Sequence, residues 1–173
     1  MSAPLRTAIF AFVGVVWLAY WLVARPTADV SASQGQWANV LLFSGLILAI
    51  GVAVLLLAPL DGRPIVASAA RVAVSGAVLS AAANIVEDGL RVEAAFYAFV
   101  LGSLVMLCGL AGMTILLVRD RALVLAPAAT LAALVFFVAA GGPLLFAGWV
   151  GAAALTRSRG PRALTGVVQP YRA

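Results

Sequence analysis

The sequence predicts an all-α fold: an integral membrane bundle of six transmembrane helices with both termini cytoplasmic. Three observations lead to this prediction, namely long apolar runs, a scarcity of charge and a one-sided distribution of arginine. Hydrophobic residues make up 65% of the chain, charged residues make up 10%, and the mean hydropathy is +1.14. A water-soluble domain carries roughly a quarter charged residues, so burial in a soluble core does not explain this balance.

Six apolar runs follow one another along the chain, and the first five approach the length that crosses a bilayer. A helix rises about 1.5 Å per residue, so about 20 apolar residues cross the roughly 30 Å hydrocarbon layer. Strands of an outer-membrane barrel would alternate polar and apolar residues, and the runs lack that alternation. The predicted helices cover residues 7–23, 38–58, 65–86, 94–118, 122–140 and 143–155.

The connections between these runs are short. The first run follows Met1 and Arg6 as a secretory signal would, but we expect it to be retained as the first helix. Asp61-Gly62-Arg63-Pro64 has the residue types of a tight turn between the second and third helices. Arg119-Asp120-Arg121 joins the fourth and fifth helices with almost no slack. Short connections predict that consecutive helices pack as antiparallel neighbours.

The region from Leu123 to Leu155 reads either as one long helix or as two helices, and arginine placement distinguishes them. Gly141-Gly142-Pro143 interrupts the run, and this combination is a strong turn signal. With six helices, one side of the membrane holds nine of the eleven arginines, whereas five helices divide them five against six. Arginine-rich loops stay cytoplasmic during insertion, so we predict six helices. The nine are Arg6, Arg63, Arg71, Arg119, Arg121, Arg157, Arg159, Arg162 and Arg172.

The chain reads as one domain with a short tail. Residues 1–156 form a single transmembrane helical domain, and residues 157–173 form a basic cytoplasmic tail. Each arginine near an anionic membrane surface contributes about 1 kcal/mol, so we expect membrane lipids as partners of the tail. All eleven basic residues are arginine, which is typical of GC-rich coding, and we expect an integral protein of a bacterial plasma membrane.

The third helix carries two stripes of small residues. Spacing of four places each stripe on one face, where other helix backbones can approach closely. Intramolecular helix packing is the favoured interpretation, and a dimer seam or a ligand groove is the alternative. The stripes are Ala69, Ala73, Ala77 and Ala81 on one face, and Ser68, Gly76, Ser80 and Asn84 on the next.

Missing residue types exclude several kinds of chemistry. Without histidine, the chain cannot build a bis-histidine haem site, a histidine-ligated zinc site or a serine–histidine protease. The single cysteine, Cys108, excludes a dithiol relay, and the lack of lysine excludes a Schiff base. No phosphate-binding loop is present. We therefore expect no cofactor, no resident metal and no nucleic-acid partner; catalysis is left open only for the surface carboxylates, and a non-enzymatic role is favoured.

One polar constellation stands out at the end of the third helix and the start of the fourth. If the helix continued unbroken, Asn84 and Asp88 would share one face and Glu87 and Arg91 another. Tryptophan and tyrosine gather near the same membrane level. These residues predict an outer pocket with aromatic walls and a polar floor, formed by Asn84, Glu87, Asp88, Arg91, Glu93, Trp17, Trp21, Trp37 and Tyr97. An interfacial aromatic belt beside a solvated acidic loop is the simpler alternative.

Three function hypotheses remain. The leading one is a membrane protein that acts by binding, as an accessory or scaffold subunit of a larger complex or homo-oligomer, or as a receptor for an amphipathic ligand at the outer leaflet. The second is a transporter or channel-like subunit lined by serine, threonine and Asn84. The third is a metal-dependent enzyme that uses Glu87, Asp88 and Glu93 on a lipid-linked substrate, because clustered carboxylates bind calcium or magnesium.

The arginine asymmetry generates a topology prediction. A reporter fused after Ala173 should be inaccessible from the exterior of intact cells, because six helices return the chain to the side on which it began. Protease or impermeant-label accessibility of the fused reporter measures this directly. A reporter accessible from outside would contradict the six-helix arrangement.

Overall fold

The computed structural model describes residues 3–24, 35–135 and 137–158, and within these ranges the chain is all helical, with no strand. This confirms the predicted all-α class. The elements are α1 Ala3–Ala24, α2 Gly35–Leu57, a short helical turn Ala58–Leu60, α3 Pro64–Asn84, a wider turn Ile85–Gly89, α4 Ala95–Leu117, α5 Arg121–Val135 and α6 Phe137–Ser158.

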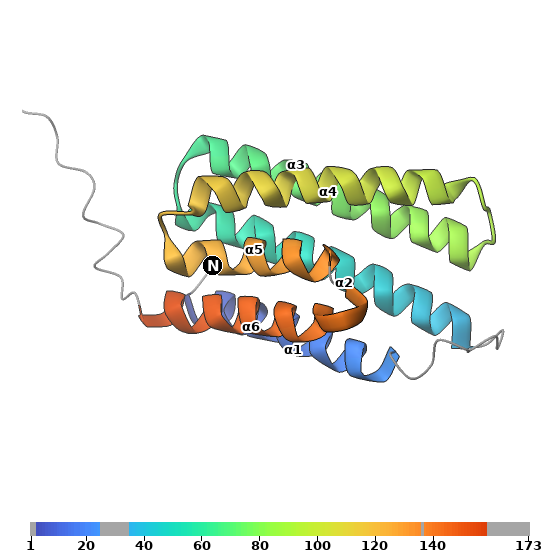
Figure 1. The fold of residues 1–173 in the computed structure, drawn as a ribbon, viewed down its shortest axis with the longest axis horizontal. Coiled ribbons are helices and arrows are strands. Elements are labelled where there is room, and N and C mark those ends of the chain that lie inside the picture. Colours follow the sequence, from blue (N-terminus) through green and yellow to red (C-terminus); the bar gives the residue numbers. More distant parts are fainter. Residues whose placement is uncertain (1–2, 25–34, 136, 159–173) are drawn as a thin grey trace, which may run out of the picture.

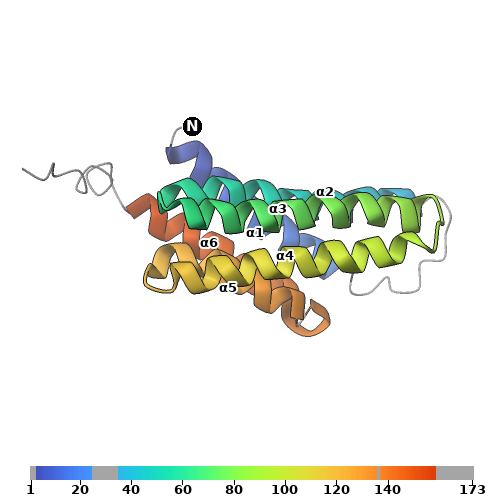
Figure 2. The same ribbon diagram turned by 90° about the horizontal axis from the view of Figure 1, so that it is seen from above.

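Each helix packs against its neighbours in sequence, and α1 closes the arrangement by packing against α6. Figures 1 and 2 show the resulting bundle of roughly parallel and antiparallel rods, with α3 and α4 together on one side and α1 and α6 together on the other. The most extensive contact joins α3 to α4, and those between α1 and α6 and between α5 and α6 follow. The short connections therefore do produce antiparallel neighbours, as their length predicts.

Four helical segments are long and apolar enough to cross a membrane, which supports an integral membrane protein. They cover Pro4–Leu22, Trp37–Leu60, Pro64–Gly89 and Ala95–Leu117. A further apolar helix, Arg121–Leu134, is shorter than these four. Large apolar side chains such as Phe12, Ile65 and Ile115 are more than half exposed on the outside of the bundle. Such exposure is costly in water and normal in lipid, where no hydrophobic force drives these side chains inward.

One end of the bundle is held by an ion pair. The Arg63 guanidinium donates to both oxygens of the Asp61 carboxylate, at 2.6 and 2.9 Å. It also donates to the backbone oxygen of Leu116 at 2.6 Å, which ties the α2–α3 turn to the end of α4. The hydrogen bond to Asp61 raises the pKa of Arg63 above its ordinary value. The turn predicted at Asp61-Gly62-Arg63-Pro64 thus also links two helix ends, and Gly62 supplies its positive φ of 80°.

The contact between α3 and α4 is close because glycine occupies it on both helices. A Cβ on Gly76 would overlap the backbone nitrogen of Met106, and one on Gly109 would overlap that of Ala73. A Cβ on Gly102 would lie 2.6 Å from the backbone nitrogen of Ser80. The small-residue faces of the third helix therefore serve packing within the chain, which is the interpretation that the sequence favoured.

Tryptophan side chains join two other helix pairs by hydrogen bonds. The indole nitrogen of Trp17 in α1 donates to the backbone oxygen of Leu46 in α2 at 3.1 Å. The indole nitrogen of Trp149 in α6 donates to the hydroxyl oxygen of Thr130 in α5 at 3.0 Å. Both indoles are buried, so a donor left without a partner would be costly in the lipid-surrounded interior.

The turn predicted at Gly141-Gly142-Pro143 is not found there, because these residues lie inside α6. α5 ends at Val135 and α6 begins at Phe137. Gly142 serves helix packing, because a Cβ there would lie 2.5 Å from the Cβ of Trp21 in α1. Pro143 falls early in α6, and helix-breaking residues are tolerated inside membrane helices. The prediction of two helices between Leu123 and Leu155 is nevertheless correct, and Figure 1 shows α5 and α6 running antiparallel.

The close α3–α4 contact gives a stability prediction. Gly76→Ala should lower the free energy of unfolding by about 1–3 kcal/mol, because the new methyl group must push α4 away. Gly45 in α2 is the matched control, since a Cβ there meets nothing within 4 Å. Gly45→Ala should cost nothing and can gain up to about 1 kcal/mol from helix propensity. Thermal unfolding in detergent micelles measures both, and equal melting temperatures for the two variants would refute the packing argument.

Candidate functional site

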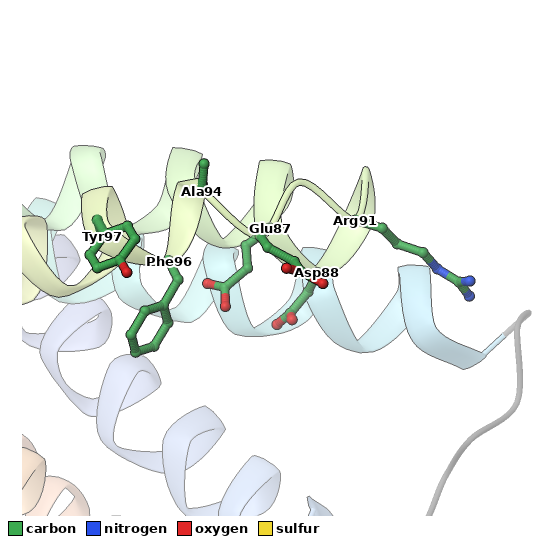
Figure 3. Close-up of a pocket in the computed structure, with 7 residues that line it drawn as sticks. Glu87, Asp88, Arg91, Ala94, Phe96 and Tyr97 are labelled. Carbon is green, nitrogen blue, oxygen red and sulfur yellow. The ribbon is translucent and has the colours of Figure 1, made fainter.

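An open cleft lies where α3 ends and α4 begins. Its volume is about 690 Å³. Three carboxylates, one guanidinium and two aromatic rings surround it, and all come from a single stretch of chain (Figure 3). The lining residues are Glu87, Asp88, Arg91, Glu93, Ala94, Phe96 and Tyr97.

A widened helical turn positions the first two carboxylates. At Ile85–Gly89 the backbone changes to a five-residue repeat, and the Leu90 nitrogen donates to the Ile85 oxygen at 3.2 Å. Turns of this width inside helices are rare and frequent at functional sites. In Figure 3 the carboxylates of Glu87 and Asp88 point to the same side as the ring of Phe96. The two adjacent acidic side chains therefore line one cleft.

The chain reverses immediately after this turn through a residue in the left-handed region. Arg91 has a φ of 58°, a conformation that costs a residue with a side chain about 1–2 kcal/mol. The widened turn ends at Gly89, and glycine is a common residue at the end of a helix. Its lack of a side chain has a second reason, because a Cβ would lie 2.6 Å from the ring of Trp37 in α2. The ring of Trp37 therefore packs against the widened turn at Gly89.

The cleft is electrically negative and partly apolar. Three carboxylates and one guanidinium give it a formal charge of −2. Figure 3 shows the guanidinium of Arg91 directed away from the carboxylates of Glu87 and Asp88. The ring of Tyr97 is 78% exposed and that of Phe96 is 49% exposed, and the two rings lie 6.1 Å apart. Such a surface can attract a cation through charge and through the faces of its rings.

Five of the nine residues predicted for the outer pocket line this cleft, and four do not. Glu87, Asp88, Arg91, Glu93 and Tyr97 are the five. Phe96 and Ala94 line it as well, although the predicted set omitted them. Phe96 follows Glu93 by three residues, a spacing that brings side chains to one helix face, so sequence periodicity could have indicated it.

Asn84 lies elsewhere because it is buried between α2 and α3. It is 4% exposed, and its amide nitrogen donates to the Ser44 hydroxyl at 3.0 Å and to the Val40 oxygen at 3.5 Å. Asp88, four residues further on, is exposed and lines the cleft, whereas Asn84 does not. Asn84 therefore joins two helices and does not line the cleft.

The three tryptophans of the predicted pocket also contact other helices. The Trp17 side chain is 1% exposed and donates a hydrogen bond to Leu46 of α2. Trp21 packs against Gly142 of α6. Trp37 packs behind the widened turn at Gly89. Tyr97 and Phe96 are therefore the aromatic residues that line the cleft. The large rings of the three tryptophans pack between helices instead.

The polar residues suggested for a transport route mostly form hydrogen bonds that hold the bundle together. The Ser80 hydroxyl lies 3.2 Å from the Ser103 hydroxyl across the α3–α4 contact. Ser44 accepts from Asn84, and Thr130 accepts from Trp149. The Thr114 hydroxyl donates a hydrogen bond to the backbone oxygen of Leu110 in its own helix. Ser68 and Ser75 lie on exposed faces of α3. These contacts explain the polar groups without a solute pathway.

The metal-dependent alternative names Glu87, Asp88 and Glu93. Within the described ranges, no three acidic, cysteine or histidine side chains come close enough together to hold a metal ion.

No protein-family model matches this chain, and no curated protein or solved structure matches it significantly.

The buried Asn84–Ser44 pair gives a second stability prediction. Asn84→Ala and Ser44→Ala should each lower the free energy of unfolding by about 1 kcal/mol, and the double variant should lose less than the two losses combined. A double-mutant cycle measured by thermal unfolding in micelles gives the coupling. Purely additive losses would contradict a hydrogen bond between the two side chains.

Proposed function

We propose that this chain is a small bacterial plasma-membrane protein that binds an amphipathic cation in the cleft between α3 and α4. In this proposal six helices span the membrane, both termini are cytoplasmic, and the cleft opens at the outer leaflet. The observation that carries the proposal is the convergence of two carboxylates and an aromatic ring on one open space.

The charge of the cleft supports a cationic ligand. Glu87, Asp88 and Glu93 outnumber Arg91, so an anion would meet net repulsion. Tyr97 and Phe96 add the electron-rich faces that bind ammonium groups, at about 0.5–2 kcal/mol per contact. A quaternary ammonium fits this surface well, since it is weakly hydrated and needs no hydrogen-bond partners.

The position of the cleft supports an amphipathic ligand. Its carboxylates lie at the end of the apolar segment Pro64–Gly89, and its rings lie at the start of the apolar segment Ala95–Leu117. In a membrane this level is the boundary between headgroups and hydrocarbon, where aromatic rings are commonly found. A ligand with one charged end and one apolar end fits both sides of that boundary.

Equilibrium binding of dodecyltrimethylammonium to the protein in dodecyl maltoside micelles tests the proposal. The wild-type protein should bind it in preference to dodecyl sulfate, which has the same tail and the opposite charge. Replacing both nearby carboxylates (Glu87→Gln with Asp88→Asn) should weaken binding at least about tenfold, because each carboxylate within 4–6 Å of a cation contributes about 1 kcal/mol or more.

Arg91→Gln is the matched control with the opposite sign. It removes a charge from the same cleft, so binding of the cation should strengthen where the carboxylate variants weaken it. Equal binding of the cationic and anionic amphiphiles, or binding that is insensitive to the double carboxylate variant, would overturn the proposed function.

A further inference from the structure

The outer face of α3 carries polar side chains that the bundle does not use. Ser68, Arg71 and Ser75 are three and four residues apart and therefore share one face of the helix. All three are exposed, and none has a side-chain hydrogen bond or ion pair to any residue in the described ranges. A partner for this polar face has to come from outside the part of the chain that the structure describes.

The carboxylates that the structure describes do not neutralise Arg71. At the same end of the bundle, Asp61 is paired with Arg63, and Asp120 accepts hydrogen bonds from two backbone nitrogens at the start of α5. The other described carboxylates belong to the cleft, and Figure 1 shows the α3–α4 turn at the opposite end of the bundle. Arg71 therefore has no counter-charge among the described residues, and such a charge is costly within an apolar segment.

Arg71 lies close enough to the membrane boundary to reach a lipid headgroup. The segment Pro64–Gly89 has 26 residues, so it is about 39 Å long, and the hydrocarbon layer is roughly 30 Å thick. When the segment is centred in the membrane, the Cα of Arg71, about 10 Å from that of Pro64, lies about 6 Å inside the boundary. Long side chains on a helix lean toward its N-terminus, and arginine extends its charge to the headgroups. We therefore expect the guanidinium over Ser68, at the level of lipid phosphates.

The charge around this position favours an anionic lipid. The Arg63 guanidinium donates to the Leu116 backbone oxygen, which places the start of α3 beside the end of α4. Arg119 and Arg121 follow that end directly, and both are exposed. Basic side chains near a membrane surface attract anionic lipids, so the end of the bundle opposite the acidic cleft offers a matching surface.

We infer that Arg71 and Ser68 bind the phosphate of an anionic phospholipid in the leaflet opposite the cleft. A guanidinium can donate two parallel hydrogen bonds to a phosphate, and a serine hydroxyl can donate a third. The occupant is a lipid and not free phosphate, because the exposed side chains of Val72 and Val78 continue this side of α3 into the hydrocarbon layer. A partner protein's carboxylate at this depth would itself be costly to bury. This site is separate from the cleft and does not depend on the proposed function.

Lipid retention by the intact protein tests this inference. Protein in dodecyl maltoside micelles is titrated with palmitoyl-oleoyl phosphatidylglycerol or with phosphatidylcholine of the same chains, and bound lipid is counted by native mass spectrometry. The wild-type protein should bind phosphatidylglycerol at least about fivefold more tightly than phosphatidylcholine. Arg71→Gln should weaken phosphatidylglycerol binding by about fivefold or more, which is the factor expected for one arginine at a membrane surface.

Two matched controls separate a site from general charge attraction. Arg157→Gln removes the same charge from an exposed position at the end of α6 and should change phosphatidylglycerol binding by less than about twofold. Ser68→Ala should weaken binding about threefold, whereas Ser75→Ala, on the side of Arg71 away from the headgroups, should have no effect. Equal losses in Arg71→Gln and Arg157→Gln, or equal binding of the two lipids by the wild-type protein, would overturn the inference.

Photolabelling of the unmodified protein gives a second readout, which holds even where Arg71→Gln folds poorly. Phosphatidylglycerol with a diazirine on its headgroup should label α3 between Pro64 and Val72, as mapped by residue-resolved mass spectrometry. Label absent from this stretch would contradict the inference. A second protein that is retained by the wild-type protein and lost in Arg71→Gln would identify a protein partner in place of the lipid, and would overturn the inference as well.

Discussion

The close approach of α3 and α4 is the constraint on which the rest of the structure depends. Gly76 faces the backbone of α4, and Gly102 and Gly109 face the backbone of α3, so the two helices touch without side chains between them. Lipid provides no hydrophobic force for helix association, and dense packing of this kind replaces it. Because the two helices are held in register along their length, the chain between Asn84 and Ala95 has to reverse in a short space. The widened turn and the left-handed Arg91 accomplish that reversal, and the cleft results from it.

Polar groups in this chain divide into two populations with different roles. Those within the bundle, such as Asn84 with Ser44 and Trp149 with Thr130, join neighbouring helices. Within the described ranges, every buried side-chain nitrogen or oxygen has a hydrogen-bond partner. This agrees with the high cost of an unpaired polar group surrounded by lipid. The acidic side chains of Glu87, Asp88 and Glu93 lie outside this interior, at the edge of the apolar segments.

Periodicity and charge patterns predicted features that depend on neighbouring residues in the sequence. They were less reliable for residues whose position is set by contacts with another helix. The small residues of the third helix did mark a packing face, and the acidic cluster did lie beside an exposed tyrosine. The Gly141-Gly142-Pro143 signal failed because Trp21 needed a glycine at position 142 for packing, which has the same sequence signature as a turn. Asn84 does not line the cleft because another helix supplies its partners: it is buried with its amide nitrogen donating to Ser44 and Val40 of α2. Hydropathy does not indicate such a pairing.

The amino-acid sequence by itself determined the helical class, the membrane setting and the acidic character of one end, because these follow from apolar run length and from residue composition. Tertiary structure alone decided which aromatic residues face the cleft, since packing partners compete for the same rings. It also decided that Gly141-Gly142-Pro143 lies inside α6, because the close packing of Trp21 on Gly142 requires the same residue type as a turn.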